Sequence, residues 1–108
     1  MSHRLNTELW VQALVRRCFV DNIPAFIVAR GDKERGGILL KVNHFNNGCE
    51  VLQPTTGMDG ERIWMRLTGD AMVDESDADV IVSKRRKYDT DLWVIEIEDP
   101  DSRFDLDK

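Results

Sequence analysis

Three alternating residues, Arg62, Trp64 and Arg66, form the strongest candidate for a binding site in this sequence. In a strand, side chains two residues apart point to the same face, so these three would project together. Guanidinium groups bind carboxylate or phosphate through paired hydrogen bonds, and an indole offers a surface for stacking. The pattern therefore predicts a shallow platform for an anionic or planar ligand, or for an acidic segment of a partner.

Two other interpretations of this stretch stay open. Glu96 and Glu98 alternate in the same way near the end of the chain, and cross-strand arginine–glutamate pairs would form if the two strands were neighbours. Alternatively, a helix covers this face and Trp64 belongs to the core. Only the platform interpretation predicts a ligand.

A second cluster of charge lies in the segment from Arg30 to Gly37, RGDKERGG, which is rich in glycine. Glycines allow a backbone to approach a phosphate closely, but this segment has neither the GxGxxG nor the GxxxxGK[ST] spacing, and no helix is expected after it. The pattern favours a solvated hairpin loop. Asp32 within the loop is kept as a candidate contact for a ligand or partner.

Histidines, cysteines and carboxylates predict no catalytic residue, no metal site and no cofactor. His44 shares the parity of an expected strand and points toward the core, where a hydrogen-bonded packing role is the usual one. Cys18 and Cys49 lack metal-ligand spacing and are predicted to be small buried residues, although a thiolate pair between Cys49 and His44 is conceivable across a hairpin. The acidic residues from 96 to 107 lack the turn glycine of a calcium loop and indicate a solvated tail. Enzyme activity is left uncertain, with the balance against it.

Composition and charge exclude several functional classes. The 108 residues carry a net charge of −5, with seven basic against five acidic residues in 1–54 and eight against fifteen in 55–108. An acidic chain repels phosphate backbones, so no nucleic-acid binding is predicted. The apolar runs are too short to cross a membrane, and the first residues lack the apolar core of a secretory signal. A cytoplasmic protein with free thiols is predicted.

Two helices are predicted from different signals. Apolar residues recurring at three and four positions indicate a helix over 8–22, which Asn6 or Thr7 can cap, although a strand over 9–15 also fits the valines and Trp10. The segment 74–88 begins with acidic and ends with basic residues, the order that the helix dipole favours. That order explains the basic run Lys84–Lys87 without a partner.

A period of two predicts the strands. They are expected over 25–30, 37–45, 49–53, 62–67 and 92–98, with a hairpin turn at Asn46-Asn47-Gly48. The order α-β-β-β-β-α-β indicates an α+β fold, with an antiparallel sheet of about five strands and both helices on one face. We expect a single domain over 1–108, with flexible ends at 1–7 and 100–108.

Three blocks of sequence carry a resemblance to a known family. LWVQAL with the following RR lies at 9–17, RGD at 30–32 with GGILLKVN at 36–43, and DTDLWVIEIED at 89–99. In this order and spacing they resemble DUF1491, a family of short uncharacterised proteins typical of alphaproteobacteria, over roughly residues 8–104. Thr90 departs from the proline expected in many relatives. The resemblance implies a bacterial cytoplasmic protein of unknown function and supplies no catalytic residues.

The leading functional hypothesis is a non-enzymatic interaction or accessory domain. It would bind a protein partner, or a second copy of itself as a homodimer, through a sheet edge or through the face formed by Arg62, Trp64 and Arg66. The alternative is a small-ligand sensor or minor hydrolase, with a site between the loop Gly31–Gly37 and the arginine face. A flat apolar patch would favour the first hypothesis, and a concave pocket with convergent polar groups the second.

Overall fold

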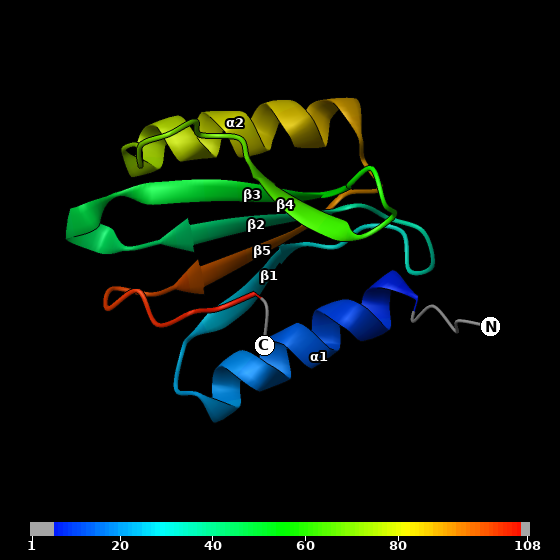
Figure 1. Cartoon of the computed structure of the whole chain (residues 1–108), viewed down its shortest axis with the longest axis horizontal. Coiled ribbons are helices and arrows are strands. Elements are labelled where there is room, and N and C mark those ends of the chain that lie inside the picture. The colour runs from blue at the N-terminus through cyan, green and yellow to red at the C-terminus, as the bar shows by residue number, and fades with distance from the viewer. Residues whose placement is uncertain (1–5, 107–108) are drawn as a thin grey trace.

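A five-stranded sheet with one helix on each face makes up the computed structural model, which describes residues 6–106 apart from the side chains of Thr56 and Arg62 (Figure 1). The elements in chain order are α1 (Thr7–Val20), β1 (Ala25–Ala29), β2 (Ile38–Asn43), the short 3-10 helix η1 (Phe45–Asn47), β3 (Cys49–Thr56), β4 (Arg62–Arg66), α2 (Glu75–Tyr88) and β5 (Trp93–Glu98). The predicted α+β class and element order are confirmed. The alternative strand over 9–15 is wrong, because these residues lie within α1.

The sheet is mixed, which corrects the prediction of an antiparallel sheet. Its strand order is β1-β5-β2-β3-β4. β5 runs antiparallel to β1 but parallel to β2, in a register from Ile38 opposite Trp93 to Asn43 opposite Glu98. The expected hairpin between β1 and β2 is therefore absent, since β5 lies between them. β2 and β5 have apolar side chains on both faces. They lie next to each other inside the sheet, because both faces of an inner strand can be buried.

The two helices lie on opposite faces of the sheet, which corrects the prediction that they share one face. Figure 1 shows α2 on one side of the strands and α1 on the other. α1 buries Val11, Leu14 and Cys18 against a core that includes residues of β2 and β5. α2 packs Ala78 against a second core that includes Leu39, from the other face of β2. With both helices on one face, that second core would have been left in water.

The ends of α1 follow from local chemistry. The Asn6 side chain accepts a hydrogen bond from the backbone N–H of Leu9 and so caps the first turn, as predicted. After Val20 the chain turns through Asn22, whose φ is +60°, and this turn places β1 beneath the helix. Neither α1 nor α2, the two α-helices of the described residues, is long and apolar enough to span a bilayer.

α2 is attached to the sheet by a buried lysine as well as by apolar contacts. Lys41 Nζ on β2 donates to Glu75 Oε2 at 2.8 Å and to Asp79 Oδ1 at 2.6 Å, both on α2. Glu96 of β5 lies 3.5 Å from the same nitrogen. Burial opposes the charge, but the hydrogen bonds that Lys41 donates to Asp79 and Glu75 outweigh it and raise the pKa of Lys41 above its ordinary value.

Candidate functional site

The predicted platform residues on β4 do not form one exposed row. The Trp64 ring is partly buried on the α1 side of the sheet, with its centroid 5.9 Å from that of Trp10. This arrangement matches the interpretation in which a helix covers Trp64. The side chain of Arg62 lies outside the described part of the chain. The platform thus stays a prediction that the packing of Trp64 argues against.

Arg66 forms hydrogen bonds with residues close to β4, one on β3 and one in the segment after β4. Its Nε donates to Glu50 Oε1 at 3.1 Å, and its Nη1 donates to the Asp70 carbonyl at 3.2 Å. The cross-strand pairs expected with Glu96 and Glu98 do not form, because β3 and β2 separate β4 from β5.

Asp32 organises the loop before β2, and its role as a ligand or partner contact stays a prediction. Its Oδ2 accepts hydrogen bonds from the backbone N–H groups of Glu34 and Arg35, and its carbonyl accepts from the Trp93 indole. A Cβ on Gly31 or Gly36 would collide with a backbone carbonyl of the segment before β5, so these glycines serve close packing. The loop lies at the start of β2. Glu50, the partner of Arg66, instead contacts His44, which follows the end of β2. Arg66 therefore lies away from the loop, and the sensor or hydrolase site stays a prediction.

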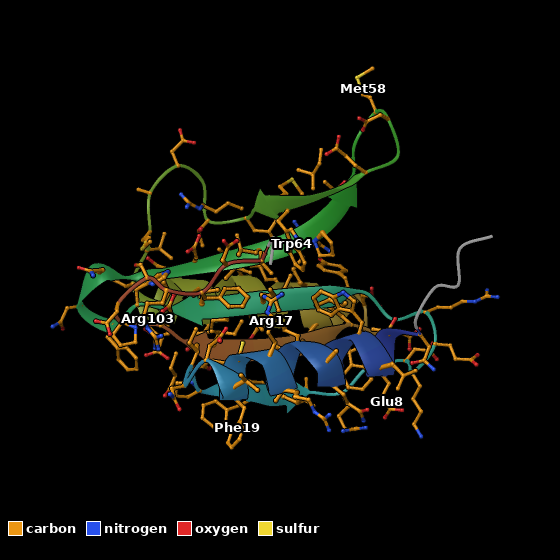
Figure 2. All side chains as sticks on the ribbon, turned by 60° about the horizontal axis from the view of Figure 1, so that its bottom comes forward. Glu8, Arg17, Phe19, Met58, Trp64 and Arg103 are labelled. Atoms are coloured by element: carbon orange, nitrogen blue, oxygen red, sulfur yellow. The ribbon has the colours of Figure 1, made fainter. Side chains whose placement is uncertain are left out.

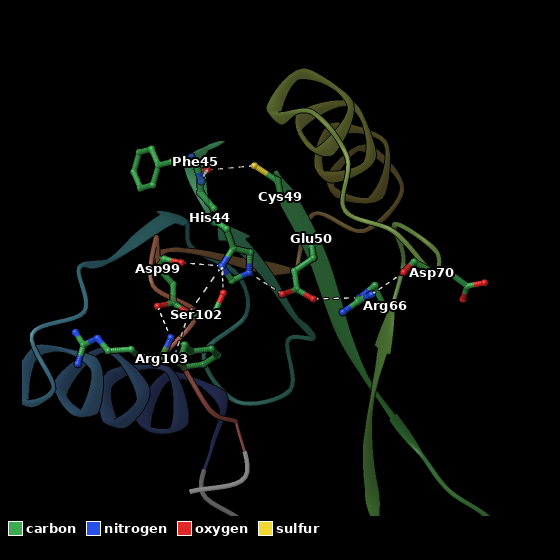
Figure 3. Close-up of polar contacts among 11 residues, drawn as sticks. His44, Phe45, Cys49, Glu50, Arg66, Asp70, Asp99, Ser102 and Arg103 are labelled. Carbon is green, nitrogen blue, oxygen red and sulfur yellow. Dashed lines mark hydrogen bonds and ion pairs between the residues drawn. The ribbon is translucent and has the colours of Figure 1, made fainter. Parts of the chain in front are cut away.

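A polar cluster that the sequence did not predict lies where the parallel strands end. His44 follows β2 and Asp99 follows β5, so both leave the same edge of the sheet (Figure 3). Both residues are buried. His44 Nδ1 donates to the Asp99 carbonyl at 2.7 Å, and Nε2 lies 2.8 Å from Glu50 Oε2. We refer to His44, Glu50, Asp99 and the nearby Ser102 as the His44 cluster.

The His44 cluster is poorly arranged for nucleophilic catalysis. Ser102 Oγ lies 3.4 Å from His44 Nδ1, which suggests a serine–histidine pair. However, Nδ1 carries the hydrogen that it donates to the Asp99 carbonyl and cannot also accept the serine proton. Nε2 faces the Glu50 carboxylate, so both ring nitrogens are engaged by neighbouring groups. The imidazole joins three segments of chain instead of activating a hydroxyl, which is the packing role predicted for it.

Asp99 was expected in a solvated tail, and that expectation is wrong. Its two carboxylate oxygens accept hydrogen bonds from the backbone N–H groups of Arg103 and Phe104, which closes a turn after β5. Arg103 in turn donates to the carbonyl of Asp21 at the end of α1. The available signal was the pair Asp99-Pro100, which favours turn initiation. Flexibility of 100–108 stays a prediction, and these contacts argue against it as far as residue 104.

The two cysteines are buried thiols, as predicted. Burial raises the pKa of both Cys18 and Cys49, so neither is a ready nucleophile. The Cys49 Sγ donates to the Asn43 side-chain oxygen at 3.4 Å, which gives no support to a pair with His44. Within residues 6–106, no group of His, Cys, Asp and Glu is arranged to hold a metal ion.

An apolar surface surrounds the outer edge of β1. Phe26 is 51% exposed on the α2 side of the strand, where α2 does not reach, and Val28, in the bulge that follows, is 58% exposed. Phe19 and Val20, at the end of α1, are 80% and 72% exposed, and Figure 2 shows Phe19 pointing away from the sheet. We call these four residues the β1 surface. A groove of about 400 Å³ lies beside them, lined by residues of α1 and β1 and by the turn between these elements.

A cavity of about 320 Å³ adjoins this groove and shares Asn22, Ile23 and Pro24 with it. Asn22 and Phe45 line the cavity with positive φ angles of +60° and +57°, and Ser102, at +55°, lies in the turn that follows β5. Non-glycine residues adopt such angles only when the surrounding structure holds them there. The Arg103 guanidinium on the cavity wall is already bonded to the end of α1.

Comparisons with known proteins identify the family. The DUF1491 family model, described as a protein of unknown function, matches residues 5–107. A crystal structure of a DUF1491 family protein from Caulobacter crescentus CB15 is 35% identical, with a TM-score of 0.83 over 93% of this chain and 92% of that one. An NMR structure of a DUF1491 family protein from the same organism is 34% identical, with a TM-score of 0.80 over 94% and 92%.

A solution structure of a protein from A. tumefaciens is also similar, with 27% identity and a TM-score of 0.73 over 89% of this chain and 86% of that one. Among curated proteins there is no match. The resemblance inferred from the three sequence blocks is thus confirmed, and the chain belongs to the DUF1491 family of proteins of unknown function.

Proposed function

We propose that the protein is a cytoplasmic, non-enzymatic interaction domain that binds a protein partner along the outer edge of β1. The observation that carries this proposal is the β1 surface, four large and mostly exposed apolar side chains beside a strand that ends the sheet. Two of them, Phe19 and Phe26, line the same groove, and contiguous apolar surface marks interaction sites in proteins.

The backbone of β1 supports docking of an extended segment. Glu98 N–H donates to the Pro24 carbonyl at 2.9 Å, so this pair is of the hydrogen-bonded type. Because such pairs alternate along an antiparallel ladder, Phe26 also bonds toward β5, and the backbone groups of Ala25 and Ile27 point away from it. These free groups are what an added strand would bind.

The other edge of the sheet is better protected. β4 begins and ends with arginine, and charged residues at a strand edge discourage pairing with another chain. β1, with the sequence AFIVA, has no charged residue. Its protection is limited to the bulge between Ile27 and Ala29. A partner that adds a strand is therefore expected at β1.

The remaining groups support a non-enzymatic role in the cytoplasm. In the His44 cluster both ring nitrogens already serve structural contacts. The two thiols are buried and form no disulfide, which is typical of proteins in a reducing compartment.

Affinity capture with matched variants tests the proposal. Val28→Lys places a charge on the β1 surface, and Met65→Lys places the same charge on a similarly exposed apolar residue of β4. We expect at least one protein from an extract of the source organism to be captured by the wild type and by Met65→Lys but lost with Val28→Lys. If Val28→Lys captures the same proteins as the wild type, the β1 surface is not the binding site.

A further inference from the structure

We infer that the occupant of the β1 edge is a second copy of this chain, paired antiparallel with β1 around a two-fold axis that passes Phe26. This inference rests on the proposed function and names its partner. It follows from the register that the free backbone groups of β1 permit, from the side chains that this register brings together, and from the flanking charges.

The free backbone groups select the register. Ala25 and Ile27 point their N–H and C=O groups outward, so each must face an outward-pointing residue of the other copy. A two-fold axis at Phe26 places Ala25 opposite Ile27 of the second copy, and Ile27 opposite Ala25. Both pairs are then hydrogen-bonded. Pro24 bonds toward β5, so its missing N–H leaves no gap on the outer edge.

The neighbouring register is less favourable. A two-fold axis at Ile27 would place Ala25 opposite Ala29 of the second copy. Ala29 lies beyond the bulge, where it is the residue paired with Val94 of β5. The shift caused by the bulge turns the Ala29 backbone toward β5 and away from the outer edge, so the outer hydrogen bonds of this register are lost.

The side chains agree with the Phe26 register. Phe26 lies opposite Phe26 of the second copy in a non-hydrogen-bonded pair, the type in which facing side chains are closest. Val28 lies opposite Pro24 of the second copy. Both phenyl rings are on the face that α2 leaves uncovered, where nothing in the described chain competes for them. Aromatic pairs of this kind add to the energy of area burial.

Area and charge are also compatible with a stable pair. The β1 surface exposes on the order of 400 Å² of apolar area, so two copies together with their backbone edges bury on the order of 1,000 Å², the lower range for a specific interface. Arg30, just after β1, and Asp21, just before it, have opposite charges near the two ends of the strand, so antiparallel pairing brings Arg30 of one copy toward Asp21 of the other; Arg30 is also paired with Glu8 of its own chain. Both α1 helices then lie on one side of a sheet that continues through both copies.

Light scattering of the purified protein tests the inference directly. We expect the wild type and Met65→Lys to have the mass of two chains and Phe26→Lys to have the mass of one. Phe26 is half-exposed, so its replacement should leave the fold intact, which circular dichroism and thermal melting check. A monomeric wild type at millimolar concentration would overturn the inference, and so would a Phe26→Lys variant that remains folded and dimeric.

A cysteine at the axis tests the register. In Phe26→Cys, two cysteines face each other in a non-hydrogen-bonded pair, with a Cα separation of about 4.5 Å that suits a disulfide. We expect this variant to form a covalent dimer under mild oxidation. Val28→Cys is the control, because in this register its two cysteines are four residues apart, roughly 13 Å, and should not cross-link. Cross-linking of Val28→Cys in preference to Phe26→Cys would overturn the proposed axis.

The experiments distinguish failure of the proposed interaction domain from failure of the self-pairing inference. If the wild type is monomeric but loses a captured protein on Val28→Lys, the self-pairing inference is wrong and the interaction domain stands. If the wild type is dimeric but Phe26→Cys does not cross-link, the dimer uses another surface and the inference is wrong. If the protein is monomeric and Val28→Lys captures everything that the wild type captures, both fail.

Discussion

The two faces of the sheet are closed to different extents. On the α1 side one apolar core runs across the whole sheet, from Ile27 on β1 to Trp64 on β4. On the α2 side the core is smaller, and the apolar residues of both edge strands are left partly in solvent. These residues are Phe26 and Val28 of β1, and Ile63 and Met65 of β4. Each edge strand thus contributes to stability on one face and presents apolar surface on the other.

The helices explain this difference. α1 buries Val11, Leu14 and Cys18, whereas α2 has one fully buried residue, Ala78, and depends on the ion pairs of Lys41. A helix with so narrow an apolar stripe covers the middle of a sheet but not its edges. The α1 face therefore supplies most of the stability, and the α2 face supplies the surface available to a partner.

The test with the largest expected effect shortens one apolar side chain on each helix. Leu14→Ala, on α1, should lower the free energy of unfolding by about 3 kcal/mol, because Leu14 is buried in the larger core. Ile81→Ala, on α2, should lower it by about 1 kcal/mol, since Ile81 is only partly buried. Urea denaturation measures both. Equal losses would show that the two faces contribute equally.

A smaller test uses neighbouring residues of β4 that face opposite sides. Trp64→Ala should cost about 2 kcal/mol, because the indole packs on Trp10 beneath α1. Met65→Ala should cost about 0.5 kcal/mol, because the Met65 side chain is about half-exposed on the α2 side. The same denaturation assay applies. A costlier Met65→Ala would reverse the assignment of faces at this edge.

Local signals were sufficient to predict the elements. The cap at Asn6, the acidic-to-basic order of 74–88 and the turn at Asn46-Asn47-Gly48 each depend on residues within a few positions of one another. The position of β5 does not depend on such signals. Its pairing with β2 joins segments about fifty residues apart, and alternation alone does not say which strands are neighbours.

The candidate sites show the same limit. Alternation correctly separated Trp64 from Ile63 but could not say which side the larger core would occupy, so it left open which face of β4 a helix covers. Asp99 looked solvated because its neighbours are acidic, yet it follows a buried strand and caps a turn. The β1 surface was missed because its exposure depends on how far α2 extends across the sheet.

The attachment of α2 through Lys41 predicts a distinct pH dependence. Lys41→Met keeps most of the packing but removes the charge, and should cost about 1 to 2 kcal/mol at pH 7, because the exposed carboxylates of Glu75 and Asp79 remain partly solvated. The pKa of Lys41 is raised by folding, so its contribution is complete below the ordinary lysine pKa of 10.5 and is lost as the pH rises above that value. The difference between wild type and variant, measured by denaturation from pH 7 to 11.5, should therefore shrink above pH 10.5. A constant difference would assign the loss to packing alone.

The smallest effect concerns the two thiols, which report on the two faces separately because Cys18 lies on the buried face of α1 and Cys49 in the core beneath α2. Burial raises both pKa values, so labelling by a thiol reagent requires the structure to open. If α2 is the less firmly held helix, the single-cysteine variant Cys18→Ala should label at Cys49 about three to ten times faster than Cys49→Ala labels at Cys18, a difference of about 1 kcal/mol in opening free energy. Labelling in urea, where both thiols are exposed, is the reference that corrects for intrinsic reactivity. Faster labelling of Cys18 would mean that α1 opens first. The helix on the larger core would then be the less firmly held of the two.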